Sequence, residues 1–532
     1  MRNLRLLALL PLALALFANA AAEFDGPAPL SWRWTPVSAK VAPSGKPLVV
    51  DGTIYISVGD RVYALDQSTG NEKWKFPTTQ DVEGGYFRKS PVMAGGILVI
   101  TNDTMLYGLD PATGKQVWSY KLVDPTQSIL GGAVSTGKFV VCALNGEYLL
   151  AINGADGKEI WPAQQHVFDR LKGGMVTSGD TLFYFTQTNA LCSLNVNAPA
   201  KVKTLGQFST LSEDAVPVLR GGILYINTGS YLAAFNATSG SLRWQIDTQE
   251  DLVYGPAVSA EGEAVVSRDG ILTIADPYGH IKTMRTPDGK KSMQMKVDLQ
   301  SGASAEPGAA GAFFVVPTLN GVLNLVDPKD GEIVWRYMVH PMSEEAAARL
   351  RAAGKAGQIA GSNGVSRPDP ANYSIEAAGP PVVVGDTLLL LAADGSLLSF
   401  DKTTGVDVTG PDVRMVSPLA GSEVSSHDLA VAFRISDDAS GVKETTITLT
   451  ANGKPVDHEY TADGLDIVRF SLHGANDLLP DGRVEFVLTV SDWLGNTTTA
   501  HFSLSIDNSL QPVYSQLPKG TPSAAGGKGG RR

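Results

Sequence analysis

Residues 66–74 read DQSTGNEKW and contain a pattern that recurs along the chain: Asp or Asn, three residues, Gly, three residues, Trp. The Asp or Asn side chain can bond the backbone at the start of a turn. The Gly supplies the left-handed conformation that closes a hairpin loop. Each copy therefore predicts a hairpin whose second strand carries the Trp. The copies are Asp66, Gly70 and Trp74; Asp110, Gly114 and Trp118; Asn153, Gly157 and Trp161; Asn236, Gly240 and Trp244; and Asp327, Gly331 and Trp335.

Weaker copies at Asn195, Asp276 and Asp401 fill the gaps between the five complete ones. Successive Asp or Asn markers then lie about 40 residues apart, which is the length of a four-stranded β-propeller blade. Eight such units predict an all-β, eight-bladed propeller over residues 28–410. The last interval is longer and holds an insertion at 341–373, in which Ser343 can cap a short helix that Gly354 ends. The insertion is interpreted as solvated, or alternatively as an arm that contacts a partner.

Residues 30–34 read LSWRW and lie upstream of the first unit, whereas the eighth unit has no Trp strand after Gly405. We expect this N-terminal strand to complete the last blade. Such closure would remove the exposed edges of the first and last units.

The N-terminus is typical of a signal peptide over residues 1–22. Arg2 and Arg5 precede an apolar run at 6–17, and the small residues Ala18-Asn19-Ala20 follow. The run is too short to span a bilayer, and no Cys follows it as a lipid anchor. We therefore expect the mature chain to be periplasmic, secreted or on the cell surface, without a transmembrane segment.

The repeat ends near Pro411, and alternating strands over residues 413–508 predict an immunoglobulin-like β-sandwich. Residues 509–532 are rich in Pro, Gly and Ser and are expected to be disordered. Asp437 and Asp438 lie in a turn of this module. They are interpreted as solvated carboxylates, or alternatively as calcium ligands.

Composition excludes several classes of protein. The net charge of −11 argues against a nucleic-acid partner. Two Cys residues cannot form a disulfide-rich scaffold, a four-Cys zinc site or an iron–sulfur site. The sequence leaves open whether Cys142 and Cys192 pair with each other. It contains no hydrolase or nucleotide-binding motif, and we assign no catalytic, cofactor-binding or metal-ligating residue.

The repeated Asp/Asn-x3-Gly-x3-Trp unit resembles that of the pyrroloquinoline quinone (PQQ) type β-propellers over residues 28–410. This superfamily includes quinoprotein alcohol dehydrogenases and the BamB type of outer-membrane assembly lipoprotein. The resemblance implies that each repeat Trp packs between neighbouring blades, with Trp32 or Trp34 as the N-terminal equivalent. The dehydrogenases typically carry two adjacent Cys residues beside the cofactor, whereas Cys142 and Cys192 are far apart.

The preferred hypothesis is a non-catalytic exported propeller scaffold that mediates protein–protein interaction in the cell envelope, with outer-membrane protein assembly as one candidate role. No cofactor is expected under this hypothesis. One alternative is an oxidoreductase that depends on PQQ and calcium. Another is a surface protein that binds carbohydrate or cell wall. The partner, the propeller face that binds it and the oligomeric state do not follow from the sequence.

Overall fold

The computed structural model describes residues 24–511, except for 37–44, 80–81, 84, 162–163, 168–169, 211–215, 286–290, 341–357, 360–366, 369–373, 428, 462–466 and 473–477. The proposed signal peptide, the short helix expected after Ser343 and nearly all of the tail lie outside these residues. The described residues contain strands and turns and no helix, which confirms the all-β class.

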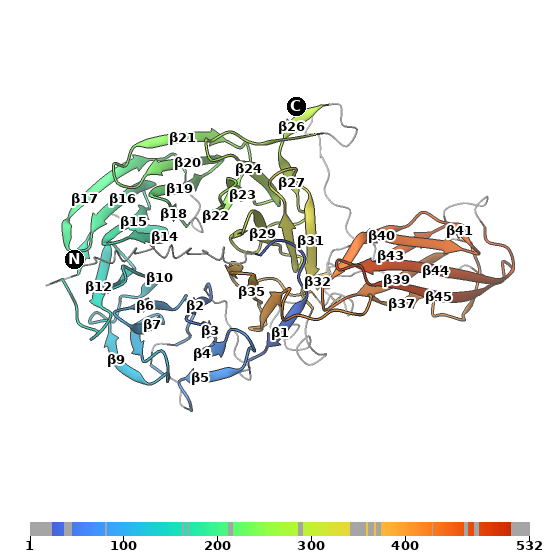
Figure 1. The fold of residues 1–532 in the computed structure, drawn as a ribbon, viewed down its shortest axis with the longest axis horizontal. Coiled ribbons are helices and arrows are strands. Elements are labelled where there is room, and N and C mark those ends of the chain that lie inside the picture. The colour runs from blue at the N-terminus through green and yellow to red at the C-terminus, as the bar shows by residue number, and fades with distance from the viewer. Residues whose placement is uncertain are drawn as a thin grey trace, which may run out of the picture.

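Eight four-stranded antiparallel sheets follow one another around a ring (Figure 1). We number them by their order in the chain, so that sheet 1 begins at β2. Sheet 1 contains β2 (Leu48–Val50), β3 (Thr53–Val58), β4 (Arg61–Asp66) and β5 (Glu72–Phe76), and sheet 2 contains β6 (Val92–Ala94), β7 (Ile97–Thr101), β8 (Met105–Leu109) and β9 (Gln116–Lys121). Sheet 3 contains β10 (Ile129–Ser135), β11 (Phe139–Leu144), β12 (Tyr148–Asn153) and β13 (Gln165–His166), and sheet 4 contains β14 (Leu171–Ser178), β15 (Thr181–Thr186), β16 (Ala190–Asn195) and β17 (Ala198–Gln207).

Sheets 5 to 8 continue the ring in the same way, and sheet 6 carries the additional hairpin β25 (Thr283–Arg285) and β26 (Ser292–Gln294). A further two-stranded pair is β32 (Gln358–Ile359) and β33 (Arg367–Pro368). Sheets 5 to 8 contain β18 (Val218–Arg220), β19 (Ile223–Thr228), β20 (Tyr231–Asn236) and β21 (Leu242–Asp247); β22 (Leu252–Val258), β23 (Glu263–Ser267), β24 (Ile271–Ala275) and β27 (Lys296–Asp298); β28 (Gly308–Ala310), β29 (Phe313–Pro317), β30 (Val322–Val326) and β31 (Ile333–Met338); and β34 (Val382–Val384), β35 (Thr387–Leu391), β36 (Leu397–Asp401) and β1 (Leu30–Trp34).

The N-terminal strand closes the ring, as expected from its two Trp residues. β1 pairs antiparallel with β36, with Trp34 opposite Leu397. Sheet 8 therefore combines strands from both ends of the propeller, and the outer edge of β36 is covered.

The apolar core of the ring lies between neighbouring sheets. One cluster joins Ile54 and Tyr63 of sheet 1 to Leu389 and Leu397 of sheet 8, with Trp32 packed against it. The middle strands bury side chains on both faces, as in β8, whereas an outer strand such as β9 alternates between buried and exposed residues. Sheet-to-sheet packing therefore explains why the middle strands are nearly continuous runs of apolar residues.

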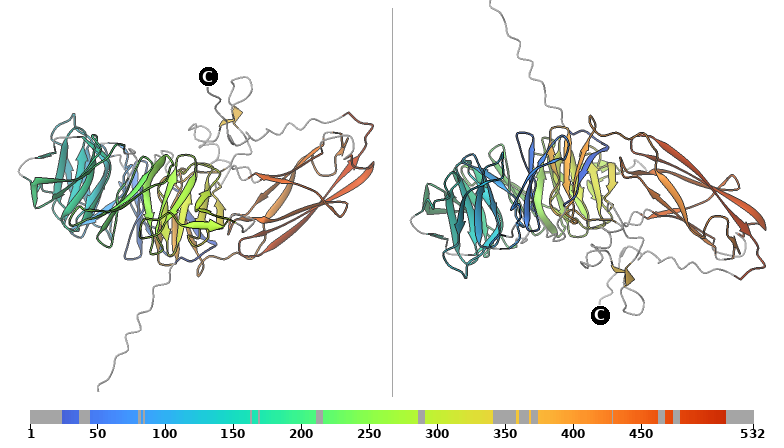
Figure 2. Two further views of the ribbon diagram at one scale, coloured as in Figure 1. Left: turned by 90° about the horizontal axis from the view of Figure 1, so that it is seen from above. Right: turned by 90° about the horizontal axis from the view of Figure 1, so that it is seen from below.

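A two-sheet sandwich follows the ring and extends from its edge (Figure 2). Phe433 and Phe486 belong to its apolar core, which both sheets enclose. The immunoglobulin-like assignment stays a prediction. One sheet contains β37 (Asp412–Ser417), β39 (Ala430–Ser436), β43 (Ile467–Ser471) and β42 (Glu459–Thr461), and the other contains β38 (Glu423–Val424), β45 (Thr497–Ile506), β44 (Gly482–Asp492), β40 (Val442–Ala451) and β41 (Lys454–Pro455).

Candidate functional site at the junction of ring and sandwich

The repeat Asp forms the turn that the sequence pattern predicts. The Oδ1 atom of Asp66 accepts hydrogen bonds from the backbone N–H groups of Ser68 and Thr69, each at 3.1 Å. Gly70 adopts a φ of 70° and donates its N–H to the Asp66 carbonyl at 2.8 Å. Hydrogen bonding, above all from the Ser68 hydroxyl, holds the pKa of Asp66 well below its ordinary value. The turn is therefore a structural element with an ionised cap.

Three of the repeat Gly residues, Gly70, Gly114 and Gly157, also make room for a Trp of the preceding sheet. A Cβ atom added at Gly70 would lie 2.5 Å from the ring of Trp32, and one added at Gly114 would lie 2.5 Å from the ring of Trp74. Both distances are shorter than van der Waals contact. Trp32 is thus the N-terminal equivalent of the repeat Trp, whereas Trp34 packs edge-on against Tyr63 at 4.6 Å.

The indole N–H of the docked Trp reaches the backbone of the next sheet. Its acceptor is the carbonyl of the residue that directly follows the next Asp or Asn marker. The donor–acceptor pairs are Trp32 and Gln67 at 3.1 Å, Trp74 and Pro111 at 3.0 Å, Trp118 and Gly154 at 2.9 Å, and Trp161 and Val196 at 2.8 Å.

The remaining signature residues occupy related places with different neighbours. Trp244 packs on Gly279 of the following sheet, and Gly157 receives Trp118. Where the preceding sheet lacks a Trp, an aliphatic or Met side chain takes its position. Leu205 lies against Gly240, and Met295 lies against Gly331. Asp110, Asn153 and Asn236 accept bonds from their turn backbones as Asp66 does, and Asp327 accepts one from Lys329.

Trp335 departs from this scheme and joins the ring to the sandwich. Its side chain is fully buried, and its Nε1 donates a 2.8 Å hydrogen bond to the Ser440 carbonyl, which belongs to the loop between β39 and β40. The Tyr337 hydroxyl donates to the Asp438 carbonyl at 2.8 Å. The repeat Trp of sheet 7 therefore docks onto the second module.

Charged and close backbone contacts complete the junction. Arg336 forms an ion pair with Glu444 at 2.5 Å, and His340 Nδ1 lies 2.8 Å from Asp438 Oδ1. A Cβ atom added at Gly441 would lie 2.7 Å from the Arg336 carbonyl, so the two backbones approach closely. These contacts hold the sandwich against the outer strand of sheet 7.

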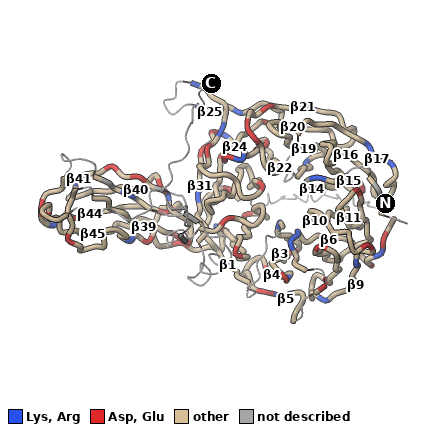
Figure 3. The backbone as a smooth tube through the Cα atoms, turned by 180° about the vertical axis from the view of Figure 1, so that it is seen from behind, with Lys and Arg blue, Asp and Glu red and all other residues tan. Residues whose placement is uncertain are grey.

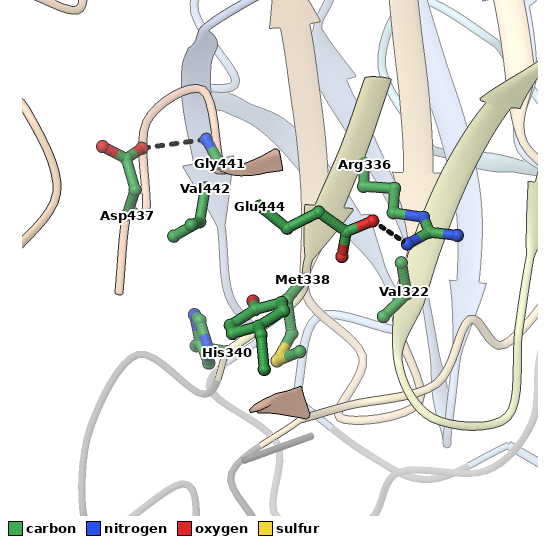
Figure 4. A pocket seen from close by; sticks show the side chains of 9 residues that line it. Val322, Arg336, Met338, His340, Asp437, Gly441, Val442 and Glu444 are labelled. Atoms are coloured by element: carbon green, nitrogen blue, oxygen red, sulfur yellow. Dashed lines mark hydrogen bonds and ion pairs between the residues drawn. The ribbon is translucent and has the colours of Figure 1, made fainter. Parts of the chain in front are cut away.

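A small cavity of about 20 Å³ lies within this junction (Figure 4). This volume can hold a water molecule but not an organic cofactor. Its lining residues are Val322, Arg336, Met338, His340, Asp437, Gly441, Val442, Glu444 and Tyr460.

A wider crevice of about 510 Å³ lies on the other side of Asp437. Asp412 and Asp438 also line it, together with Arg414, whose Nε lies 2.6 Å from Asp412. The His340 hydrogen bond lowers the pKa of Asp438, whereas burial raises the pKa of Asp437. Three carboxylates, those of Asp412, Asp437 and Asp438, thus line the crevice.

The 20 Å³ cavity is too small for PQQ, the cofactor of the quinoprotein alternative. Cys142 and Cys192 are both buried, belong to different apolar clusters and are not joined by a disulfide. They supply no cysteine pair beside a cofactor.

Three buried charged residues were not identified from the sequence. Arg33 pairs with Asp394 at 3.2 Å, with side chains only 7% and 9% exposed, and this pair ties β1 into sheet 8. Glu263 of β23 is 1% exposed, and its Oε2 atom accepts no hydrogen bond within the described residues. The position of Arg33 between two Trp residues is a sequence feature that could have indicated a buried charge. No such feature surrounds Glu263 in the sequence.

In the view of Figure 3, Lys and Arg positions are interspersed with Asp and Glu positions around the ring. Across the part of the chain that the structure describes, no helix has the length and apolar character needed to cross a membrane.

A family model described as outer membrane protein assembly factor BamB matches residues 30–204 and 277–408, together more than half of the chain. The segment between the two matches holds sheet 5 and the strands β22, β23 and β24 of sheet 6, which have the same four-stranded topology as the matched sheets. No curated protein matches the chain.

Solved structures with a similar fold include BamB from Moraxella catarrhalis, with 16% sequence identity and a TM-score of 0.47 over 70% of this chain and 100% of that one. A europium-containing methanol dehydrogenase has 14% identity and a TM-score of 0.47 over 68% of this chain and 84% of that one.

Proposed function

Because the chain belongs to the family described as outer membrane protein assembly factor BamB, we propose that it is a non-catalytic, exported scaffold that binds a protein partner in the cell envelope. The family match on both halves of the ring is the observation that carries this proposal. Outer-membrane protein assembly is the role that the family description favours, and a periplasmic or surface location goes with it.

The use of the repeat residues supports a scaffold. The Asp side chains cap turns, and the Gly and Trp residues dock one sheet onto the next. The conspicuous motif of the sequence is thus accounted for by ring assembly.

The attachment of the sandwich supports a role in presenting a surface. The Trp335, Tyr337 and Arg336 contacts all join one strand, β31, to the sandwich. A module held by several short contacts has a defined orientation relative to the ring. A partner can therefore contact the ring and the sandwich together.

Crosslinking in intact cells tests the proposal and identifies the binding face. The loops between β9 and β10 and between β11 and β12 lie on one face, because Ile129 of β10 pairs with Leu144 of β11, and Leu144 with Tyr148 of β12. A photoreactive residue at Val123, which is 81% exposed, samples this face. One at the exposed Ala112, in the turn between β8 and β9, samples the opposite face.

We expect a reproducible envelope protein to be recovered from one of these positions by mass spectrometry. The matched position on the other face serves as the control for random capture. Recovery of no reproducible envelope protein from either face would contradict the proposal.

A further inference from the structure

Three carboxylates from distant parts of the chain converge beside the junction. Asp407 lies between β36 and β37, Asp437 follows β39, and Asp492 ends β44. One oxygen atom of each lies within 4.8 Å of the other two. Asp437 is 8% exposed and Asp492 is fully buried. The fold therefore gathers three acidic groups, of which Asp407 is partly buried and the other two are buried.

One of these carboxylates has a buried oxygen atom without a protein donor. The Oδ2 atom of Asp407 is buried and accepts no hydrogen bond from the described residues. The hydrogen bonds that the described structure gives Asp437 all reach Oδ1, from the backbone N–H groups of Ala439, Ser440 and Gly441 at 2.8–3.0 Å. The buried Oδ2 atom of Asp407 is costly without a donor, and a cation would relieve that cost.

The third carboxylate is held firmly in place. Asp492 Oδ1 accepts the backbone N–H groups of Leu494 and Asn496, each at 2.8 Å. The Asn496 side chain donates to Asp492 Oδ2 at 2.7 Å and to the Asp407 carbonyl at 3.3 Å. The amide thus brings the Asp407 segment next to Asp492.

The charge of the cluster is not balanced by basic residues. None of the three carboxylates forms an ion pair with a described residue within 4.0 Å. Three like charges gathered in this way are unfavourable unless a cation or a proton lies among them.

We propose that Asp407, Asp437 and Asp492 bind one divalent cation, with calcium preferred, which ties the segment after the ring to the sandwich. Calcium takes oxygen ligands at about 2.4 Å, so two of its ligands can lie up to about 4.8 Å apart. The group contains no Cys or His, which disfavours zinc and copper. The crevice that Asp437 lines gives the cation a path from solvent and room for water ligands.

This site differs from the calcium alternative drawn from the sequence, which paired Asp437 with Asp438. Asp438 faces His340 at 2.8 Å and is absent from the cluster. Asp407 and Asp492 take its place. The proposal concerns the attachment of the sandwich to the ring and does not depend on the identity of any partner.

Calorimetric titration of CaCl2 into the full chain after chelation tests the proposal. We expect one saturable calcium site per chain and a calcium-dependent rise in melting temperature. Thermolysin cleavage between residues 406 and 411 should also slow when calcium is added, because Val406 and Val408 are 74% and 78% exposed. MgCl2 is the comparison ion, and weaker binding is expected because magnesium demands a tighter octahedral set.

Two variants keep the turns while they remove charge. Asp437→Asn retains an acceptor for its three N–H donors, and Asp407→Asn retains one for Thr409. Each should weaken calcium binding by at least about tenfold, because calcium affinity follows the charge of its ligands. Asp438→Asn is the matched control and should bind like the parent chain.

Binding that is absent in the parent chain, or equal in all three variants, would overturn the proposal. If one variant does not fold, as judged by its circular dichroism without calcium, the other decides the result. Binding lost only in Asp438→Asn would assign the ion to the other acidic pair and would also overturn it.

Discussion

The indole Nε1 of Trp335 donates a 2.8 Å hydrogen bond to the backbone carbonyl of Ser440, 105 residues further along the chain. Equivalent Trp residues, such as Trp74, donate to the next sheet of the ring. The same docking residue is therefore used once to attach a second module. The junction therefore uses the same kind of Trp contact as the ring. The contribution of Trp335 to the attachment of the sandwich can be measured separately from that of the other Trp residues.

Trp335→Phe should loosen the junction as well as destabilise the ring. The change leaves the Ser440 carbonyl without its donor and should cost about 1–3 kcal/mol. We expect faster thermolysin cleavage at residues 406–411 than in the parent chain. Trp74→Phe is the control: it loses the equivalent bond to Pro111 but should leave that cleavage rate unchanged. Equal acceleration in both variants would show that Trp335 has no special role at the junction.

Gly70→Ala should destabilise the ring more than Gly52→Ala. Both glycines have a φ of 70°, so both substitutions strain the backbone by about 1–2 kcal/mol. Only at Gly70 would the added methyl group meet the Trp32 ring; at Gly52 nothing lies within 4 Å. We expect a further loss of about 1–3 kcal/mol at Gly70, measured by urea unfolding. Equal losses would contradict docking of Trp32 on Gly70.

Deletion of residues 28–36 should markedly lower the melting temperature. The deletion removes β1 and the buried Arg33 that pairs with Asp394. It leaves the edge of β36 open to pairing with other chains. Thermal unfolding with light scattering measures both effects. An unchanged melting temperature would refute closure of the ring by this strand.

Glu263→Gln should reduce the pH dependence of stability. Burial raises the pKa of Glu263 from 4.5 to about 7. The folded state therefore binds this proton more tightly than the unfolded state. The stabilising effect of this proton on the folded state is complete below pH 4.5 and is lost as pH rises through 7. The resulting difference in the free energy of unfolding is on the order of 3 kcal/mol.

Urea unfolding at pH 5 and pH 8 measures this effect. The parent chain should lose stability between these pH values relative to the Gln variant, which has no proton to release. Parallel losses in the two proteins would show that Glu263 is ionised at its ordinary pKa.

The ring could be predicted from the sequence because its information is local and repeated. Asp66 and Gly70 lie four residues apart in one turn, and Trp32 reaches that turn from a strand with a recognisable pattern. The closing strand followed from a missing Trp in the last unit. Apolar alternation likewise predicted strands in the second module.

The junction could not be predicted, because its partners are distant and carry no shared pattern. Nothing near Trp335 indicates that its acceptor is Ser440 instead of a turn in sheet 8. Asp437 was a candidate ligand in the sequence, but its neighbours Asp407 and Asp492 become visible only when three loops are placed together. Glu263 is buried by tertiary packing alone.

The central claim is that this propeller acts by holding a protein partner in the envelope. Recovery of the photocrosslinked product from intact cells, with identification by mass spectrometry, tests it most directly. The account predicts one reproducible envelope protein linked through Val123 or Ala112 but not both. The absence of any reproducible envelope protein, in a chain shown to be exported and folded, would contradict it.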